Sequence, residues 1–313
     1  MSKHLIYNAS SAAGLGHVLT AVAVYADYAR QTGRRFHLTC RTWNLRIDNS
    51  LDVDPIFAEL FELETEGTDS IQLSERISNA AINDSNSLLL VGVGNKDIVN
   101  SFPEHERLHA HEMTHMREFR PLLENTIDHA ADCIIIQTVS PFSSLRKDFP
   151  FFDLYPAPAR LSDSLLHEAL SGVALERHVG VHIRHGNGEF LHGRSEYGTD
   201  EFQQMVSKIM RTALDIAAER NLDIIAFSDN APLLEQLHAE YGVKFVTHKM
   251  RPDKVWKDHL QALEQQERAQ AISTMLRDFY ALTQCANVVC GSSLFTTAAY
   301  IFSKHRAFTK VVS

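Results

Sequence analysis

The ten residues 180–189 read GVHIRHGNGE, a short apolar strand that runs directly into a glycine-rich polar loop. Alternation along the strand and its continuation places His182 and Arg184 on the same side of the chain. Open α/β sheets bind their ligands at the carboxyl ends of strands. An arginine there can form two charge-assisted hydrogen bonds to a diphosphate. The stretch therefore predicts an α/β sheet with a ligand-binding loop, and a solvated loop with an incidental ion pair is the alternative.

The rest of the chain repeats this alternation of short apolar runs and helix-period segments, which is typical of βαβ units around a parallel sheet. The first series has expected strands at 5–7, 36–40, 87–93 and 134–139 and expected helices at 17–32 and 104–133. The second has expected strands at 178–183, 223–227, 243–247 and 287–290 and expected helices at 162–174, 199–220, 231–241 and 293–302, with a further long helix ending near residue 284. Three prolines in FPFFDLYPAP, residues 149–158, indicate a linker. We predict two Rossmann-like α/β domains, residues 1–155 and 156–313, that face a cleft.

Composition excludes several classes of function. The chain has 313 residues and a formal net charge of −9 with no Lys/Arg run, so it lacks the cationic surplus that neutralises nucleic-acid phosphates. No stretch reaches the roughly 18–20 apolar residues that span a bilayer, and the N-terminus shows no signal peptide. Three of the four cysteines lie in apolar stretches, where buried and inert thiols are expected. We predict a cytoplasmic protein with no membrane span and no nucleic-acid partner.

A second polar turn lies near the N-terminus, where residues 10–17 read SSAAGLGH between an expected strand and an expected helix. Glycine lets backbone amides approach a ligand closely, and a helix N-terminus offers unpaired N–H groups and the positive end of its dipole. Gly14, Gly16 and His17 are therefore candidate binding residues, and a tight turn without a ligand is the alternative. The segment is not GxGxxG, and no acidic residue ends the following strand, which disfavours a dinucleotide site.

A third cluster lies near the C-terminus. Ser292 and Ser293 stand where an expected buried strand becomes a helix, so their hydroxyls and amides can hold a phosphate. Asp278 lies on a helix among apolar neighbours, where a lone carboxylate is costly without a partner. The alternative is an exposed Asp278 and a serine that only caps a helix. By contrast, a helix N-cap fully explains Asp229 and Asn230, which stand just ahead of an expected helix.

Residues 111–115 read HEMTH and match the HExxH pattern of zinc peptidases, in which two histidines share one face of a helix and the glutamate activates a metal-bound water. In a chain with 17 histidines the pattern also arises by chance. The metzincin continuation is absent, and no acidic third ligand stands at the usual downstream distance. A zinc-dependent hydrolase using His111, Glu112 and His115 is therefore kept as an alternative, and no metal or other cofactor is predicted.

Taken in order, these segments resemble the fucosyltransferases that include the rhizobial nodulation-factor α-1,6-fucosyltransferase and the eukaryotic core α-1,6 enzyme. The loop GVHIRHGNGE nearly repeats the GVHVRHGNGE of the nodulation enzyme. The resemblance also covers AGLGHVLTAVAVYADYARQTGR at 13–34 and LRDFYALTQCANVVCGSS at 276–293, whereas residues 41–132 show no match. It implies a GT-B fold of two Rossmann-like domains, with GDP-fucose held mainly by the C-terminal half. It also implies inversion at the sugar without a metal.

The resemblance assigns donor-binding roles position by position. It implies that Arg184 is the essential arginine on the diphosphate, and His185 stands where the eukaryotic enzyme has a second arginine. The other implied donor-binding positions are His182 and Asp278 at the guanosine, Ser292 and Ser293 at the diphosphate, and Asn187 within the loop.

The catalytic base has two candidates. The glutamate of the eukaryotic enzyme aligns nearer His192, and Glu189 precedes it in the loop; we rank Glu189 first. The predicted function is transfer of fucose from GDP-fucose to a hydroxyl of a glycan acceptor, by an inverting and metal-independent glycosyltransferase. Besides the zinc hydrolase, a non-catalytic nucleotide- or glycan-binding protein is the other alternative.

Overall fold

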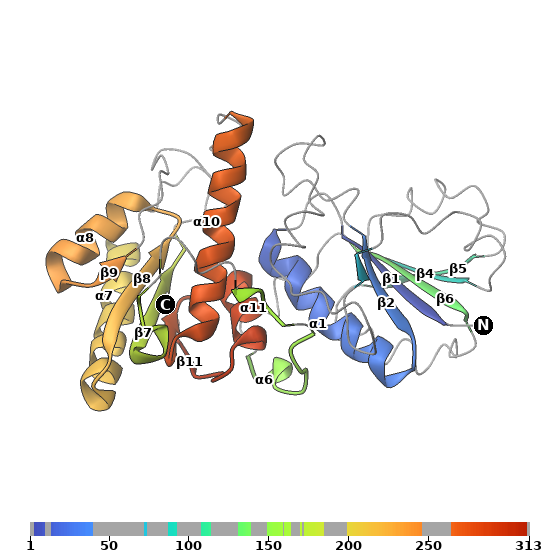
Figure 1. Cartoon of the computed structure of the whole chain (residues 1–313), viewed down its shortest axis with the longest axis horizontal. Coiled ribbons are helices and arrows are strands. Elements are labelled where there is room, and N and C mark those ends of the chain that lie inside the picture. Colours follow the sequence, from blue (N-terminus) through green and yellow to red (C-terminus); the bar gives the residue numbers. More distant parts are fainter. Residues whose placement is uncertain are drawn as a thin grey trace. The chain divides into compact units, whose positions relative to one another are not determined.

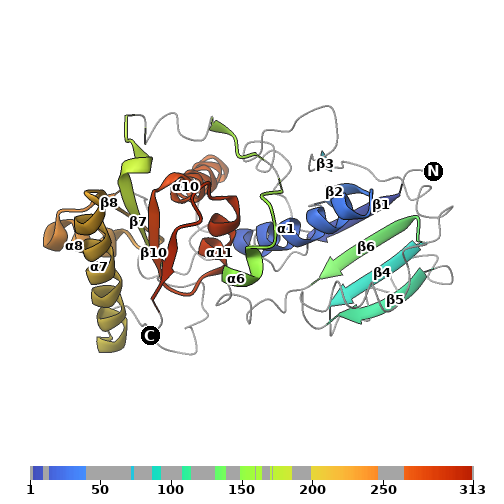
Figure 2. The ribbon, with the colours of Figure 1, turned by 90° about the horizontal axis from the view of Figure 1, so that it is seen from below.

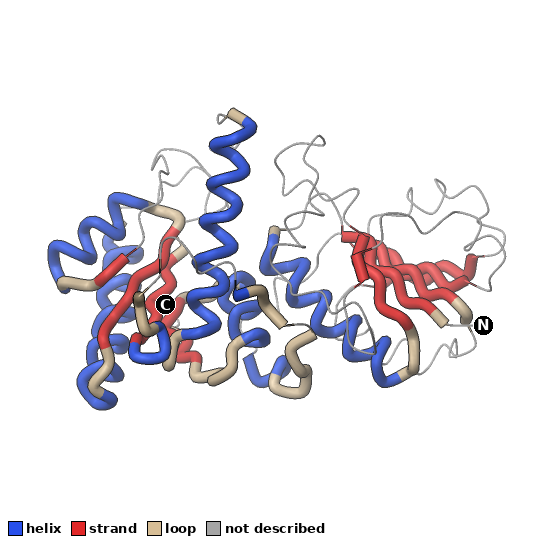
Figure 3. The backbone as a smooth tube through the Cα atoms, viewed as in Figure 1, coloured by secondary structure: helices blue, strands red, loops and turns tan. Residues whose placement is uncertain are grey.

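The computed structural model describes residues 3–9, 14–39, 72–73, 87–92, 108–113, 131–138, 149–158, 160–163, 170, 172–184, 199–245 and 264–311. The chain divides into two compact units, Met1–Leu161 and Ser162–Ser313. Each unit contains one parallel sheet with helices, as the ribbon in Figure 1 and the coloured tube in Figure 3 show. The predicted α/β class is therefore confirmed.

The first unit is built on a six-stranded sheet in the order β3-β2-β1-β6-β4-β5, in which every pairing is parallel. Its strands are β1 (His4–Ala9), β2 (Arg35–Thr39), β3 (Gln72–Leu73), β4 (Ser87–Gly92), β5 (Leu108–Met113) and β6 (Cys133–Thr138). The central strands β1 and β6 bury Leu5, Ile134 and Ile136 completely. Helix α1 (Leu15–Gln31) lies beside β1 and β2 (Figure 2).

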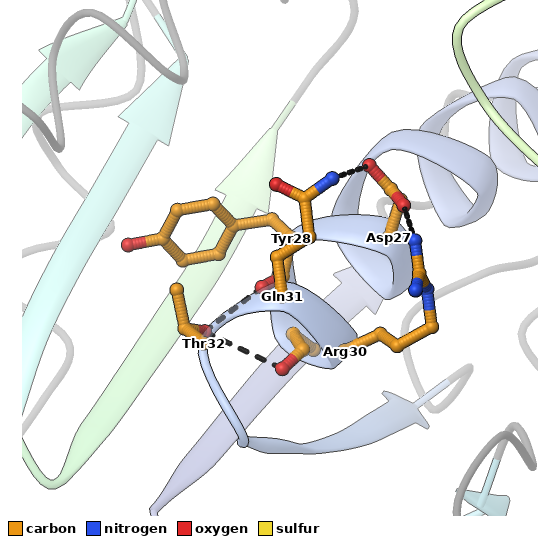
Figure 4. Close-up of polar contacts among 6 residues, drawn as sticks. Asp27, Tyr28, Arg30, Gln31 and Thr32 are labelled. Carbon is orange, nitrogen blue, oxygen red and sulfur yellow. Dashed lines mark hydrogen bonds and ion pairs between the residues drawn. The ribbon is translucent and has the colours of Figure 1, made fainter.

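Helix α1 contains one carboxylate, Asp27, and its C-terminal end keeps that group paired. Asp27 is buried and accepts hydrogen bonds from Arg30 Nη2 at 2.7 Å and from Gln31 Nε2 at 2.8 Å (Figure 4). These bonds offset the desolvation that a buried carboxylate would otherwise suffer. The hydroxyl of Thr32 donates to the Tyr28 carbonyl at 2.8 Å, so side chains satisfy the orphan groups of the last turn.

The second unit is built on a five-stranded parallel sheet in the order β11-β10-β7-β8-β9. Its strands are β7 (His178–Ile183), β8 (Asp223–Ser228), β9 (Lys244–Phe245), β10 (Asn287–Cys290) and β11 (Phe308–Lys310). Its helices are η6 (Leu175–Arg177), α7 (Asp200–Arg220), α8 (Ala231–Tyr241), α10 (Gln265–Gln284) and α11 (Leu294–Phe302).

Strand β7 has helices on both faces, and its side chains alternate between them. Val179, Val181 and Ile183 belong to the core that the sheet forms with α7 and α8. Gly180 and His182 face the other way, toward α10 and α11. Because strand side chains alternate with period two, the next residue on the α11 side is the one that follows β7.

The predicted linker at 149–158 contains a cluster of packed aromatic side chains. It begins with the four-residue helix α6 (Phe149–Phe152). Phe152 has no exposed surface, and the rings of Phe151 and Tyr155 lie 5.0 and 6.1 Å from its ring. The division between the two units falls after this segment, at Leu161.

Several predicted elements need correction. The predicted helix over 104–133 is wrong, because 108–113 form strand β5 and Cys133 begins β6. The predicted helix over 162–174 is also wrong at its described positions 162, 170 and 172–174, which are not α-helical. Helix α1 begins earlier than predicted, so Gly16 and His17 lie inside its first turn. The short strands β3 and β11 were not predicted; each is paired with a neighbouring strand that the sequence does signal. No helix within the described ranges is long and apolar enough to cross a membrane.

Candidate functional site

The candidate site lies in the second unit, at the point where the order of its strands reverses. From β7 the chain proceeds outward to β8 and β9, whereas β10 and β11 lie on the opposite side of β7. Open α/β sheets bind ligands beyond the carboxyl ends of the strands at such a switch point. Strand β7 ends there at Ile183 and is followed by Arg184, while β10 ends at Cys290 and is followed by Gly291 and two serines.

His182 is the buried polar residue of this site. It pairs in register with Cys290 of β10 and Phe227 of β8, and it is 7% exposed. Its ring stacks on the ring of Phe295, with centroids 5.3 Å apart and planes inclined by 23°. Burial, and to a smaller extent the charge of Arg184, lowers the pKa of His182 to about 3. The imidazole is therefore neutral at physiological pH.

Arg184 is the cation of the site. It is the first residue beyond β7 and is partly exposed, and its charge depresses the pKa of His182. The sequence predicts that the two residues share one side of the chain, and Arg184 lies two positions after the buried His182. A guanidinium held at the carboxyl end of a strand can form two parallel hydrogen bonds to phosphate oxygens.

The two serines after β10 differ in their surroundings. Ser293 is buried and is the N-cap of α11, because its Oγ accepts a hydrogen bond from the Phe295 backbone N–H at 3.2 Å. Ser292 is exposed beside that helix N-terminus. The predicted N-cap is therefore present at Ser293, and Ser292 offers the accessible hydroxyl. The positive end of the α11 dipole favours an anion at this position.

Asp278 lies on α10 and is buried, so the alternative of an exposed Asp278 is wrong. The following residue, Phe279, packs edge-on against Phe295 with ring centroids 5.5 Å apart. Phe279 and His182 thus both contact Phe295, although they come from different elements. A buried carboxylate requires hydrogen bonds or a charge to offset its desolvation.

Residues Gly14, Gly16 and His17 belong to the first unit. Gly14 is the N-cap of α1 and supplies no side-chain hydrogen bond, and Gly16 and His17 lie in the first helical turn. The hydroxyl of Thr20 donates to the Gly16 carbonyl at 2.8 Å and to the His17 carbonyl at 3.0 Å. His17 remains partly exposed at this helix end.

The remaining predicted loop residues, His185, Asn187, Glu189 and His192, lie outside the described residues. One contact of the site was missed by sequence reasoning, namely the stacking of Phe295 on His182. The only sequence signal for it was an aromatic residue two positions after a predicted helix cap. Nothing in the sequence indicates which distant ring such a residue meets.

The HExxH interpretation is contradicted by the local backbone. Residues His111 and Glu112 lie on β5, which pairs with β4, and His115 lies outside the described residues. The pattern binds zinc only when a helix brings its two histidines to one face one turn apart. A strand advances about 3.3 Å per residue, so the same spacing does not converge on one ion. The first four residues of β5, LHAH at 108–111, alternate between apolar and polar side chains, which favours a strand.

The assignment of Asn230 as a helix cap is confirmed. Its Oδ1 accepts a hydrogen bond from the Leu233 backbone N–H at 3.0 Å, and α8 follows with Pro232 in its first turn. Its own backbone N–H donates to Ser228 Oγ at 3.1 Å. Asn230 therefore has a structural role at the carboxyl end of β8.

Comparisons with known proteins agree with this architecture. A crystal structure of NodZ alpha-1,6-fucosyltransferase soaked with GDP-fucose is 17% identical, with a TM-score of 0.55, over 97% of this chain and 93% of that chain. A fucosyltransferase NodZ structure from Bradyrhizobium gives 16% identity and a TM-score of 0.55 over 97% and 94% of the two chains. These likenesses show a GT-B type fold. No curated protein sequence matches. The family model described as Nodulation protein Z (NodZ) matches residues 7–309, so the chain belongs to that family.

Proposed function

We propose that the chain is a glycosyltransferase that transfers fucose from GDP-fucose to a hydroxyl of a glycan. Membership of the NodZ family over residues 7–309 supports this proposal, as does the fold shared with a fucosyltransferase whose crystals were soaked with GDP-fucose. The observation that carries it is Arg184 at the switch point of the second sheet, coupled to a buried and neutral His182. This is the place and the chemistry that a nucleoside diphosphate requires.

In the proposed reaction the acceptor hydroxyl displaces GDP in one step, which inverts the sugar. Negative charge grows on the leaving diphosphate, so fixed donors at that position stabilise the transition state more than the ground state. Arg184 supplies a guanidinium, and Ser292 and Ser293 supply a helix N-terminus together with one exposed hydroxyl. Because these groups offset the growing charge, we propose that no metal ion takes part. His185 and Asn187 are proposed to complete the diphosphate loop.

Two residues are proposed as candidates for the base that acts on the acceptor hydroxyl. A carboxylate or imidazole beside the acceptor oxygen would remove its proton late in the reaction. Glu189 is our first candidate for this base and His192 the second. Guanosine is proposed to contact His182 and Asp278, both of which are buried polar residues of the second unit.

The division of labour between the two halves is also part of the proposal. Residues 156–313 are proposed to hold the donor, because Arg184, Asp278 and the two serines all belong to them. Residues 1–155 are proposed to hold the acceptor, with Gly14, Gly16 and His17 at their polar turn. A cytoplasmic location is proposed as well, and it is supported by the buried free thiols of the described residues, Cys133, Cys285 and Cys290.

The test compares Arg184→Lys and Arg184→Ala with wild type. Lysine provides a point charge in place of the two-pronged guanidinium contact, so turnover of GDP-fucose should fall by about 10²–10³ while the melting temperature stays near wild type. Alanine should lose at least as much turnover and also weaken GDP binding. Both kcat and melting temperature are measured on each variant, with and without EDTA.

Other results would identify a different function. A stable Arg184→Ala protein with full turnover would refute the role of Arg184. GDP binding by wild type without any donor turnover would favour a non-catalytic nucleotide- or glycan-binding protein. Turnover that disappears in EDTA and returns with a divalent metal would refute metal independence.

A further inference from the structure

The imidazole of His182 contacts one aromatic side chain, which in turn packs within a series of rings from two helices. Phe295 of α11 stacks on the imidazole, with centroids 5.3 Å apart and an interplanar angle of 23°. Phe279 of α10 packs edge-on against Phe295 at 5.5 Å and has no exposed surface itself. Phe302, at the end of α11, packs against Phe279 at 5.9 Å. We refer to Phe279, Phe295 and Phe302 as the aromatic column, and only Phe295 in this column stacks on His182 among the described residues.

The protonation state of the imidazole follows from its surroundings. Its Nδ1 atom is buried and has no hydrogen-bond partner among the described residues. A neutral imidazole carries one N–H and one bare nitrogen. Burying an N–H without an acceptor forfeits a hydrogen bond that water would have made, and orphaned buried N–H groups are rare in proteins. These costs favour a bare Nδ1 and a proton on Nε2.

A second proton on this ring is also disfavoured. Burial penalises the charged form, and the guanidinium of Arg184 repels an imidazolium. Both effects lower the pKa of His182, to about 3. In this site Arg184 supplies the positive charge, and the neutral His182 can supply an uncharged hydrogen-bond donor.

We propose that Phe295 is a positioning residue that holds His182 as a neutral imidazole protonated on Nε2, ready to donate a hydrogen bond to an uncharged acceptor atom of the bound nucleotide. A carbonyl oxygen or ring nitrogen of a base is such an acceptor, whereas the anionic diphosphate is left to Arg184 and the α11 N-terminus. The identity of the nucleotide rests on the proposed function; the protonation state and its dependence on Phe295 do not.

The matched pair Phe295→Leu and Phe302→Leu tests the proposal. The two residues lie on the same helix and both contact Phe279, but only Phe295 stacks on His182. Nitrogen NMR of histidine-labelled protein distinguishes a protonated ring nitrogen from a bare one, and His182→Gln identifies the His182 signals. GDP affinity is measured by calorimetry on the same proteins.

In wild type we expect a bare Nδ1 and a protonated Nε2 from pH 5 to 8. Phe295→Leu opens the ring to water, so both nitrogens should show averaged shifts, the pKa should rise toward its usual value, and GDP binding should weaken about tenfold. Phe302→Leu should lower the melting temperature and change neither the His182 signals nor GDP affinity.

Three outcomes would overturn the proposal. They are a wild-type imidazole protonated on Nδ1 or on both nitrogens at pH 7, unchanged His182 signals in Phe295→Leu, and equal effects of the two leucine variants on those signals. Failure of wild type to bind GDP would instead overturn the proposed function. The NMR comparison needs no nucleotide and would still decide the role of Phe295.

Discussion

Gly180 shows how one missing side chain permits a helix to approach a strand. A Cβ at this position would lie 2.9 Å from Cys285 Sγ and 3.4 Å from Leu282 Cδ2, both on the α10 side of β7. Gly180→Ala should therefore reduce the free energy of unfolding by about 1–3 kcal/mol, the usual cost of overpacking a core. Urea denaturation measures the change.

The control for Gly180 is Gly291→Ala in the same unit. A Cβ at Gly291 would meet nothing nearer than 3.9 Å, so we expect a change within about 0.5 kcal/mol. Cys285→Ala combined with Gly180→Ala should recover part of the loss, because the nearest obstructing atom is gone. Additive effects of the two substitutions would contradict the packing explanation.

His37 makes the stability of the first unit depend on pH. The Nε2 atom of His37 lies 3.0 Å from His4 Nδ1 across β1 and β2. Burial is the main cause that lowers the pKa of His37 to about 4, and the charges of His4 and Arg35 add smaller effects in the same direction. Between pH 6.5 and 4 the unfolded chain binds a proton that folded His37 does not. The free energy of unfolding should therefore fall as the pH drops through this window.

His37→Gln removes this titration and keeps a polar group of similar reach. Between pH 7 and pH 5, the melting temperature of the variant should fall less than that of wild type. Thermal unfolding followed at several pH values gives the comparison, and parallel profiles for the two proteins would exclude His37 as the source. His182, whose pKa is lowered to about 3, contributes the same sign in both proteins and cancels in the difference.

At the scale of elements, the two ends of α8 are determined by the residues that directly flank the helix. Asn230 caps its N-terminus through Oδ1, and Gly242 ends it in the left-handed region at φ 67°. Asn230→Ala should cost about 1 kcal/mol of unfolding free energy, whereas Asn230→Ser keeps an acceptor and should stay within about 0.5 kcal/mol of wild type. Urea titrations of both variants measure this. Equal losses in both would show that the cap is not what stabilises the helix end.

Strand β5 illustrates the opposite case, an element that its own residues do not determine. Residues 108–115 contain both an HExxH motif, which is typical of a helix, and the alternation LHAH, which is typical of a strand. Parallel pairing with β4 resolves the ambiguity, because six consecutive residues of the two strands lie in register. Tertiary pairing overrides local propensity in such short segments.

At the scale of the whole molecule, the proposed donor side can be tested by hydrogen exchange. GDP should protect the amides of 178–184 and 291–297 most, because these segments border the switch point of the second sheet. Protection of α1 should be smaller. UDP at the same concentration is the control and should protect none of these segments. Protection largest in α1 would reverse the proposed assignment of the two halves.

The sequence alone determined the α/β class, most strands and helices of the second unit, the cap at Asn230, and the position of Arg184 at the end of β7. These features depend on periodicity and capping, which operate between residues a few positions apart. The string GVHIRHGNGE also indicated the family, and the match of the family model over residues 7–309 supports that interpretation.

Only the tertiary structure decided that β5 is a strand, that Asp278 is buried, and that Phe295 stacks on His182. Each of these depends on groups that are distant in sequence and are brought together by the order of strands in a sheet. The burial of His182, and with it the neutral state of its imidazole, arises from the same packing. A sequence specifies which rings are present, but the fold decides which of them meet.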